Sequence, residues 1–251
     1  MNATFIQQAI LQLKDSIFMH VRHRTLLHYV GEPVVNENQL FFLLFPFLNG
    51  DLWGEEIQYS ASITGVVHAA LFEHDKIQEQ DATSKEQQLT VLSGDFYSGR
   101  YYELLSLAGN LRLIQKLSQG VIERCEQEAQ VYELKNFKIE DALYSWEVIE
   151  TALIRTFYEC YEFAKYTPIM TSVLKVKRIK KELELMKSGR ITYFGYVMLK
   201  SYKYDELVVK MEQNIQQEKQ RIQQELSVNT YQEELILWIE HIVNAPYNNF
   251  E

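Results

Sequence analysis

Apolar side chains follow a helical pattern over the first 29 residues of the chain. They recur in steps of three and four residues, which is the spacing of one face of an α-helix. These positions are Ile6, Ile10, Leu13, Ile17 and Val21. The pattern predicts a helix over residues 3–29, which then breaks where Gly and Pro lie close together in the chain.

A second, shorter segment is apolar on every side. Residues 40–45 carry only Leu and Phe and follow Asn36, a residue type that caps helix N-termini. Such a helix is predicted to be buried, because it is far too short to cross a bilayer. Pro46 and the Asn49-Gly50 pair are expected to end it.

The rest of the chain repeats the helical pattern. Helices are expected over residues 54–79, 87–107, 110–134, 139–165, 173–190, 207–226 and 235–243. Small residues line the first of these, so it can approach another helix closely. Strand patterns and internal repeats do not occur, and Gly and Pro are scarce. The predicted fold is an all-α bundle of about ten helices in a single domain, residues 1–251.

Charge and composition narrow the function classes. A net charge of −9 argues against a protein that grips nucleic acid. Apolar runs do not reach the roughly 20 residues of a membrane span, and the first residues do not resemble a signal peptide. A cytoplasmic location is therefore expected, with Cys125 and Cys160 reduced and buried.

One basic stretch departs from the acidic average. Residues 173–190 carry two glutamates against seven cations, namely Lys175, Lys177, Arg178, Lys180, Lys181, Lys187 and Arg190. A solvated helix face is the simplest interpretation. The alternative is contact with a partner subunit or, peripherally, with an anionic membrane through residues 175–190.

Two short sequence motifs, called phrases below, hold residues that could take part in a reaction. The first holds His68, Ala70, Phe72, His74 and Asp75. The second holds Val91, Leu92, Gly94, Asp95 and Phe96. In this order, on two successive helices, they resemble the trans-isoprenyl diphosphate synthases, whose first helix reads roughly His-Thr-Ala-Thr-Leu-Leu-His-Asp-Asp-x-x-Asp. The resemblance implies an isoprenoid-synthase-type helical bundle.

The residues that such enzymes need are missing. A leaving diphosphate must be neutralised by magnesium ions and cationic side chains, and the magnesium needs clustered carboxylates. Here Lys76 and Glu79 replace two of the aspartates, and Glu150 replaces a family lysine. The twin arginines after the first cluster, the upstream cationic phrase near Gly31 and the downstream aspartate cluster are also absent.

This pattern is similar to one subfamily, the small non-catalytic component of two-component bacterial heptaprenyl or hexaprenyl diphosphate synthases. Residues 88–105 of this chain resemble that component more than they resemble a catalytic subunit. The resemblance implies a subunit that is inactive alone, binds no cofactor and forms a heterodimer with a catalytic subunit that holds Mg²⁺. That enzyme would extend farnesyl diphosphate with isopentenyl diphosphate to an all-trans chain for menaquinone, and this subunit would help to control chain length.

Candidate site residues follow from that resemblance. No catalytic residue is expected, and Asp75 and Glu79 are weak remnants of a metal site. The candidates for the partner interface or for a structural role are His68, Phe72, His74, Asp75, Gly94, Asp95, Tyr97 and Gly99. Asp95 is expected to be buried and bonded to a neighbouring helix, and both glycines are expected to permit close packing.

Two other functions are compatible with the same residues. One is a divergent, active prenyltransferase that uses Asp75 and Glu79. The other is a non-enzymatic protein that binds prenyl lipids. Substitution of both carboxylates separates the first from an accessory subunit, and lipid binding by the isolated chain separates the second.

Overall fold

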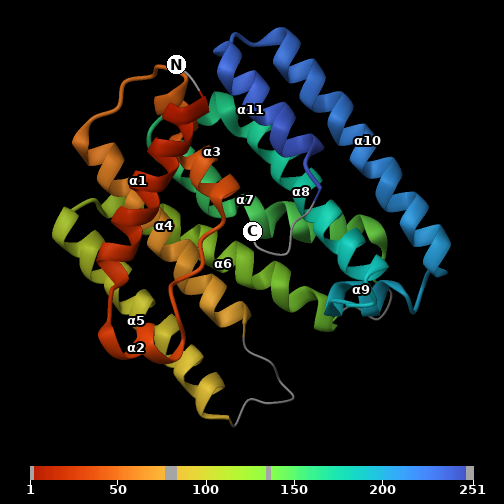
Figure 1. Ribbon diagram of the computed structural model, residues 1–251, viewed down its shortest axis with the longest axis horizontal. Helices are drawn as coiled ribbons and strands as arrows, with labels where there is room; N and C mark the ends of the chain where they lie inside the picture. Colours follow the sequence, from red (N-terminus) through yellow and green to blue (C-terminus); the bar gives the residue numbers. More distant parts are fainter. Residues whose placement is uncertain (1–2, 77–83, 134–136, 247–251) are drawn as a thin grey trace. The chain divides into compact units, whose positions relative to one another are not determined.

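The computed structural model describes residues 3–76, 84–133 and 137–246. This part of the chain forms eleven α-helices and no strands, which confirms the predicted all-α class (Figure 1). The chain packs as two compact units, residues 1–117 and 118–251. A single domain over residues 1–251 stays a prediction.

Unit 1 contains the first five helices and the start of the sixth. These are α1 (Ala3–Val21), α2 (Arg24–Tyr29), α3 (Glu37–Leu48), α4 (Glu55–Asp75), α5 (Lys85–Ala108) and α6 (Leu111–Glu133), which continues into unit 2. α1 packs against α3 and α4. The apolar side chains of α3 are almost all buried, as its sequence predicts.

The approach of α1 to α4 depends on a glycine. A Cβ at Gly65 would lie 2.2 Å from Ile17 Cδ1 and 3.7 Å from Leu40 Cδ2. Real Cβ atoms do not approach carbon so closely, because interiors are packed to the density of organic crystals. The prediction that small residues of α4 allow close helix packing is thereby confirmed.

Two helix boundaries in unit 1 differ from the prediction. The expected helix over residues 3–29 is interrupted after Val21, and His23, in an extended conformation, accepts a hydrogen bond from Leu26 N at 3.4 Å. The apolar step from Val21 to Leu26 is five residues, which departs from the steps of three and four along α1. Pro46 also lies inside α3 rather than ending it, and the helix continues for two residues to Leu48.

Other boundaries in unit 1 are confirmed. Asn36 caps α3, with its side chain accepting from Asn38 N at 2.9 Å. The Asn49-Gly50 pair ends α3, with Gly50 at a φ of +89°. Gly109 caps the C-terminal end of α5 in the left-handed conformation.

Unit 2 contains the rest of α6 and the remaining helices. These are α7 (Ile139–Cys160), α8 (Thr167–Lys187), α9 (Tyr193–Met198), α10 (Tyr204–Val228) and α11 (Glu233–Asn244). α8 packs against α7, α10 and α11. The contacts of α8 with these three helices therefore lie within unit 2.

Two further expectations are wrong in unit 2. The helix over residues 139–165 ends at Cys160, because Glu162 takes a φ of +62° that no right-handed helix can include. Cys125 is exposed rather than buried, while Cys160 is buried as expected. Within the described ranges, none of the helices is long and apolar enough to span a membrane.

Candidate functional site

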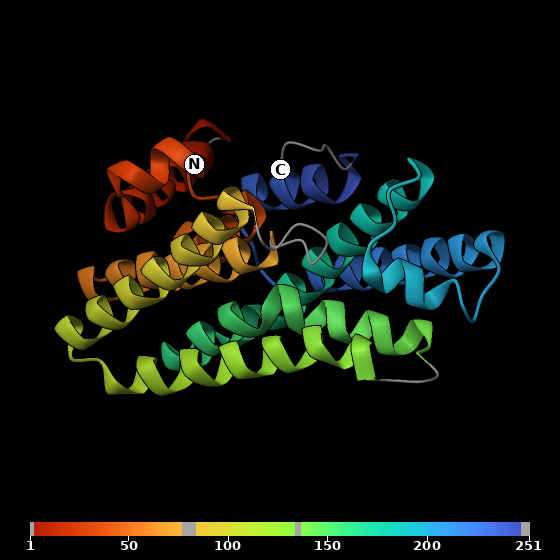
Figure 2. The same ribbon diagram turned by 90° about the horizontal axis from the view of Figure 1, so that it is seen from below.

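The helix pair that carries the two family-like phrases packs side by side in unit 1. Figure 2 shows α4 in orange and α5 in yellow running next to each other, and they share the largest helix contact of the unit. Glu55 and Glu56 lie in the first turn of α4, where carboxylates favour the positive end of the helix dipole. Ser84 caps α5 by accepting from Gln87 N at 3.2 Å. Residues at the N-terminal end of each helix thus stabilise its start.

Gly94 lies at a close contact between α5 and α4. Its ideal Cβ would lie 2.6 Å from Cε1 and 2.7 Å from Nε2 of His74 on α4. The imidazole therefore occupies the space that any larger residue would need. This contact confirms that Gly94 permits close packing, and it brings two of the predicted site residues together.

Asp95 does not have the environment expected for it. Its side chain is 65% exposed, and its Oδ1 lies 3.9 Å from His74 Nε2. The expectation of a buried carboxylate is therefore wrong, because Asp95 lies on the outer side of α5 while Ser93 and Gly94 face α4. An exposed pair of this kind contributes little to stability.

A different carboxylate is buried in its place. Glu73 is fully buried, and its Oε1 accepts from Lys76 Nζ at 2.6 Å. Its Oε2 accepts from Ser93 Oγ on α5 at 3.1 Å. Burial and, secondly, the negative charge of Glu73 raise the pKa of Tyr97 to about 12. These groups form a polar centre inside the helix pair.

Sequence reasoning missed Glu73. The family-like phrase has an apolar residue at this position, so the glutamate itself was the available signal. A charged residue where the pattern requires an apolar one predicts either an outward-facing side chain or a buried group with partners. Only the hydrogen bonds of Ser93 and Lys76 distinguish the two.

The eight candidate residues do not share one surface. His68, Gly94 and Tyr97 are buried inside unit 1, and Phe72 and His74 are half-buried. Asp75, Asp95 and Gly99 are exposed. The predicted set is thus divided between packing residues of the helix pair and residues that solvent reaches.

The outer face of α5 is partly apolar. Its exposed residues recur at helical spacing and include the apolar Val91, Leu92 and Tyr102 together with Gln88, Asp95, Gly99 and Glu103. A Cβ at Gly99 would meet nothing within 4 Å. No contact within the described chain therefore requires a glycine there, although glycine weakens the middle of a helix.

Up to residue 76, where the described segment stops, the end of α4 does not offer a set of metal ligands. Lys76 stands where the family has an aspartate, and its ammonium is already bound by Glu73. Asp75 is exposed, and Glu79 lies outside the described residues. In the ranges that the structure describes, no three His, Cys, Asp or Glu side chains group as a metal site.

Glu150, whose charge is opposite to that of the family lysine, has an ion-pair partner within unit 2. Its Oε1 lies 3.4 Å from NH1 of Arg178 on α8. Arg178 NH2 also lies 2.7 Å from Oε1 of the fully buried Glu182, and its guanidinium lies 5.8 Å over the ring of Trp146. The carboxylate that replaces a family lysine is therefore part of an internal ion network.

Cations of the basic stretch link helices rather than line the surface. Lys175 Nζ lies 2.8 Å from Glu147 and 3.5 Å from Glu218. Lys180 Nζ donates to the carbonyl oxygens of Val243 and Ala245 at 2.7 and 3.0 Å. The interpretation of residues 173–190 as a solvated face is wrong for these residues, since α8 is covered by three helices.

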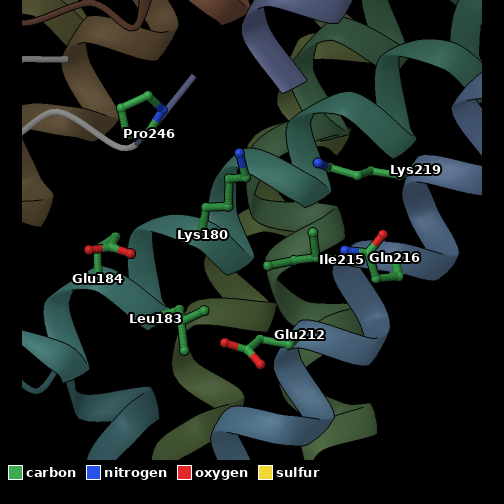
Figure 3. A pocket seen from close by; sticks show the side chains of 8 residues that line it. All are labelled: Lys180, Leu183, Glu184, Glu212, Ile215, Gln216, Lys219 and Pro246. Atoms are coloured by element: carbon green, nitrogen blue, oxygen red, sulfur yellow. The ribbon is translucent and has the colours of Figure 1, made fainter. Parts of the chain in front are cut away.

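A pocket of about 330 Å³ lies between α8 and α10 (Figure 3). It is lined by Lys180, Leu183, Glu184, Glu212, Ile215, Gln216, Lys219 and Pro246. Burial, followed by the charges of Lys219 and Lys177, lowers the pKa of Lys180. Two lysines face two glutamates, so the charges of the pocket balance and it favours neither an anion nor a cation.

The class of fold follows from comparison with solved structures. The chain superposes on the crystal structure of a heptaprenyl diphosphate synthase from Staphylococcus aureus with a TM-score of 0.74. The match covers 96% of this chain and 99% of that one, at 12% sequence identity. The fold is therefore that of this class of prenyl diphosphate synthase, as predicted.

The family follows from the sequence comparisons. Residues 23–231 match the family described as heptaprenyl diphosphate synthase subunit 1, and the chain belongs to that family. It is also 32% identical over 119 residues to heptaprenyl diphosphate synthase component 1 of Geobacillus stearothermophilus. That match covers 47% of this chain and 54%, about half, of the relative.

Proposed function

We propose that this chain is the accessory, non-catalytic subunit of a two-chain heptaprenyl diphosphate synthase. The observation that carries the proposal is the ion pair at the end of α4. There, where the family-like phrase of a catalytic chain has a metal-binding aspartate, Lys76 is held at 2.6 Å by the buried Glu73. Lys76 supplies no carboxylate oxygen for Mg²⁺, and both oxygens of Glu73 already accept hydrogen bonds from Lys76 and Ser93.

The compensation of charge elsewhere supports the same role. Ionisation of an allylic diphosphate needs cations aimed at the leaving group. In this chain Arg178 is directed at Glu150 and Glu182, so its charge is neutralised within unit 2. The Mg²⁺ and the cations that bind diphosphate therefore come from a catalytic partner subunit.

The partner docks on the outer face of α5. Glycine in a helix interior costs about 1 kcal/mol relative to alanine, and nothing in the described chain lies near the Cβ position of Gly99. Exposed Leu92 lies two turns before this glycine, and exposed Tyr102 lies one turn after it. A partner helix can approach closely at Gly99 and bury the apolar side chains beside it.

The chemistry of the complex follows the family resemblance. The heterodimer extends farnesyl diphosphate with isopentenyl diphosphate, and the all-trans product supplies the menaquinone side chain. This subunit stabilises the catalytic chain and helps to set the product length, because a long apolar product needs a dry tunnel. The complex works in the cytoplasm, with peripheral access to the membrane.

Reconstitution tests the proposal. The chain and the catalytic subunit from the same genome are assayed for incorporation of isopentenyl diphosphate into farnesyl diphosphate, separately and mixed. The mixture is expected to be active, and this chain alone inactive. Prenyl transfer by this chain alone would contradict the accessory role, and so would equal activity and product length without it.

Two variant sets separate the alternatives. Replacement of Asp75 and Glu79 by Ala is expected to leave the activity of the complex nearly intact, whereas a divergent enzyme would lose it. Leu92→Glu is expected to weaken heterodimer formation at least about tenfold, because it buries a charge. Leu237→Glu on α11 is the matched control, since the two leucines are 56% and 58% exposed. Equal loss in both would exclude α5 as the docking face.

A further inference from the structure

A row of exposed aromatic side chains lies in unit 2, beside the short helix α9 that joins α8 to α10 (Figure 1). Tyr132 at the end of α6 stacks on Tyr193, with ring centroids 4.3 Å apart and planes inclined by 18°. Tyr193 and Tyr196 have centroids 6.1 Å apart. Lys200 Nζ then lies 4.5 Å over the ring of Tyr196. These contacts make one continuous surface.

Ile191 extends this surface on the side of α8. It is exposed, and its Cγ2 would lie 3.1 Å from a Cβ at Gly195 in α9. We call the surface formed by Tyr132, Ile191, Tyr193, Tyr196 and Lys200 the α9 patch. The other side of α9 is buried, so the helix presents one fixed face to solvent.

The charge around the α9 patch is opposite to that of the whole protein. Residues 187–204 contain four cations and no carboxylate, although the chain carries a net charge of −9. Those cations are Lys187, Arg190, Lys200 and Lys203; all four are exposed, and Lys187 Nζ lies 3.5 Å from Oε1 of Glu212 on α10. The carboxylates nearest in sequence are Glu133 beside Tyr132 and the pair Asp205 and Glu206 at the start of α10.

We propose that the α9 patch binds the surface of an anionic lipid bilayer. Tyrosine is suited to the membrane interface, because its ring enters the apolar region while its hydroxyl stays in water. A lysine can extend its ammonium to the headgroups while its methylenes cover apolar surface. The combination of stacked tyrosines, an exposed isoleucine and the exposed cations of residues 187–204 fits this surface.

The position of the α9 patch differs from the membrane contact that the basic stretch suggested. Lys175 and Lys180 hold α8 to other helices, so they cannot also reach lipid. Residues 187–204 share Lys187 and Arg190 with that stretch and extend beyond it, and Lys200 lies beside an aromatic ring of the patch. The inference rests on the membrane access proposed above but not on subunit docking, since it concerns a different surface from the outer face of α5.

Vesicle flotation of the full-length chain tests this proposal. Vesicles of phosphatidylcholine alone are compared with vesicles of equimolar phosphatidylcholine and phosphatidylglycerol. Binding is expected to the anionic vesicles only and to weaken as salt screens the charges. Equal binding to both vesicle types, or none to either, would overturn the proposal.

Matched variants locate the binding surface. Lys200→Gln is expected to weaken binding about fivefold, the typical effect of one cation near an anionic surface. Tyr196→Ser is expected to weaken it further, because it removes the ring that enters the interface. The controls are Lys165→Gln, whose ammonium lies 4.8 Å over the ring of Tyr166, and Tyr144→Ser on α7.

The controls match the test residues in exposure and chemistry. Tyr144 and Tyr196 are 57% and 54% exposed, so both substitutions are expected to leave the fold intact, which circular dichroism verifies. If the controls lose as much binding as the α9 variants, attraction is spread over the protein and the proposal is wrong. If the α9 variants lose affinity for the catalytic subunit and none for lipid, the patch is a protein interface instead.

Discussion

Two glycines on α5 are predicted to respond in opposite directions to the same substitution. Gly94 faces α4, and a Cβ there would lie 2.6 Å from Cε1 of His74. Gly99 faces outward, and a Cβ there would meet nothing within 4 Å. Gly94→Ala and Gly99→Ala therefore add the same methyl group to the same helix in different surroundings.

The expected magnitudes follow from these contacts. Alanine in place of glycine in a helix interior stabilises by about 1 kcal/mol, so Gly99→Ala should raise the free energy of unfolding by this amount. Gly94→Ala has the same helix-propensity gain, but overpacking against His74 lowers its free energy of unfolding by about 1–3 kcal/mol. His74 is 35% exposed and can turn outward, at the expense of its 3.9 Å contact with Asp95. The two variants should thus differ by about 1–3 kcal/mol.

Urea unfolding of the isolated chain measures this difference, and a third variant isolates its cause. In a His74→Ala background the methyl group has room, so Gly94→Ala should become as stabilising as Gly99→Ala. The reasoning is refuted if Gly94→Ala and Gly99→Ala stabilise the wild-type chain equally, or if His74→Ala leaves the penalty at Gly94 unchanged.

The remaining predictions concern the buried charges and phenols. Glu73→Ala should destabilise the chain by about 2–4 kcal/mol in urea unfolding, since it opens a cavity and removes the acceptor of two donors; a change near zero would contradict its burial. Arg178→Met should lower the free energy of unfolding by about 3–5 kcal/mol, because it leaves carboxylates buried without their cation. Adding Glu150→Gln to this variant should recover part of the lost stability. The pKa of Tyr97 is raised to about 12 from an ordinary value of 10.0, so above pH 10.0 the unfolded phenol loses its proton first and stability falls as the pH rises toward 12. Tyr97→Phe should reduce that alkaline loss, while the share due to Tyr231, whose pKa is also raised to about 12, should persist; an unchanged profile would exclude Tyr97 as a source.

Local signals predicted several helix ends correctly. Asn36 caps α3 and Gly109 ends α5, as expected from an amide that accepts from the backbone and from a residue that tolerates positive φ. The two helix breaks that the sequence did not predict, at His23 and Glu162, share one cause. Neither residue type usually ends a helix, so no capping signal in the sequence marks these breaks.

The charged residues of the candidate site were less predictable. Asp95 looked buried because apolar residues surround it in sequence, yet it is exposed on the outer side of α5. Glu73 looked like an ordinary helix residue, yet it is fully buried. On a helix of 3.6 residues per turn, one position along the chain turns a side chain by about 100°. The direction in which α4 and α5 face each other therefore determines which carboxylate is inside.

The sequence by itself determined the all-α class, most helix positions and the family, because helical periodicity and the order of the two phrases are local properties. Only the tertiary structure decided which charges are neutralised within the chain. Lys76 is paired with Glu73 one turn away, but Arg178 and Glu150 lie on different helices, 28 residues apart. Such pairs depend on which helices meet, and burial then makes each partner necessary to the other. The same contacts direct the cations of α8 inward and leave the α9 patch exposed.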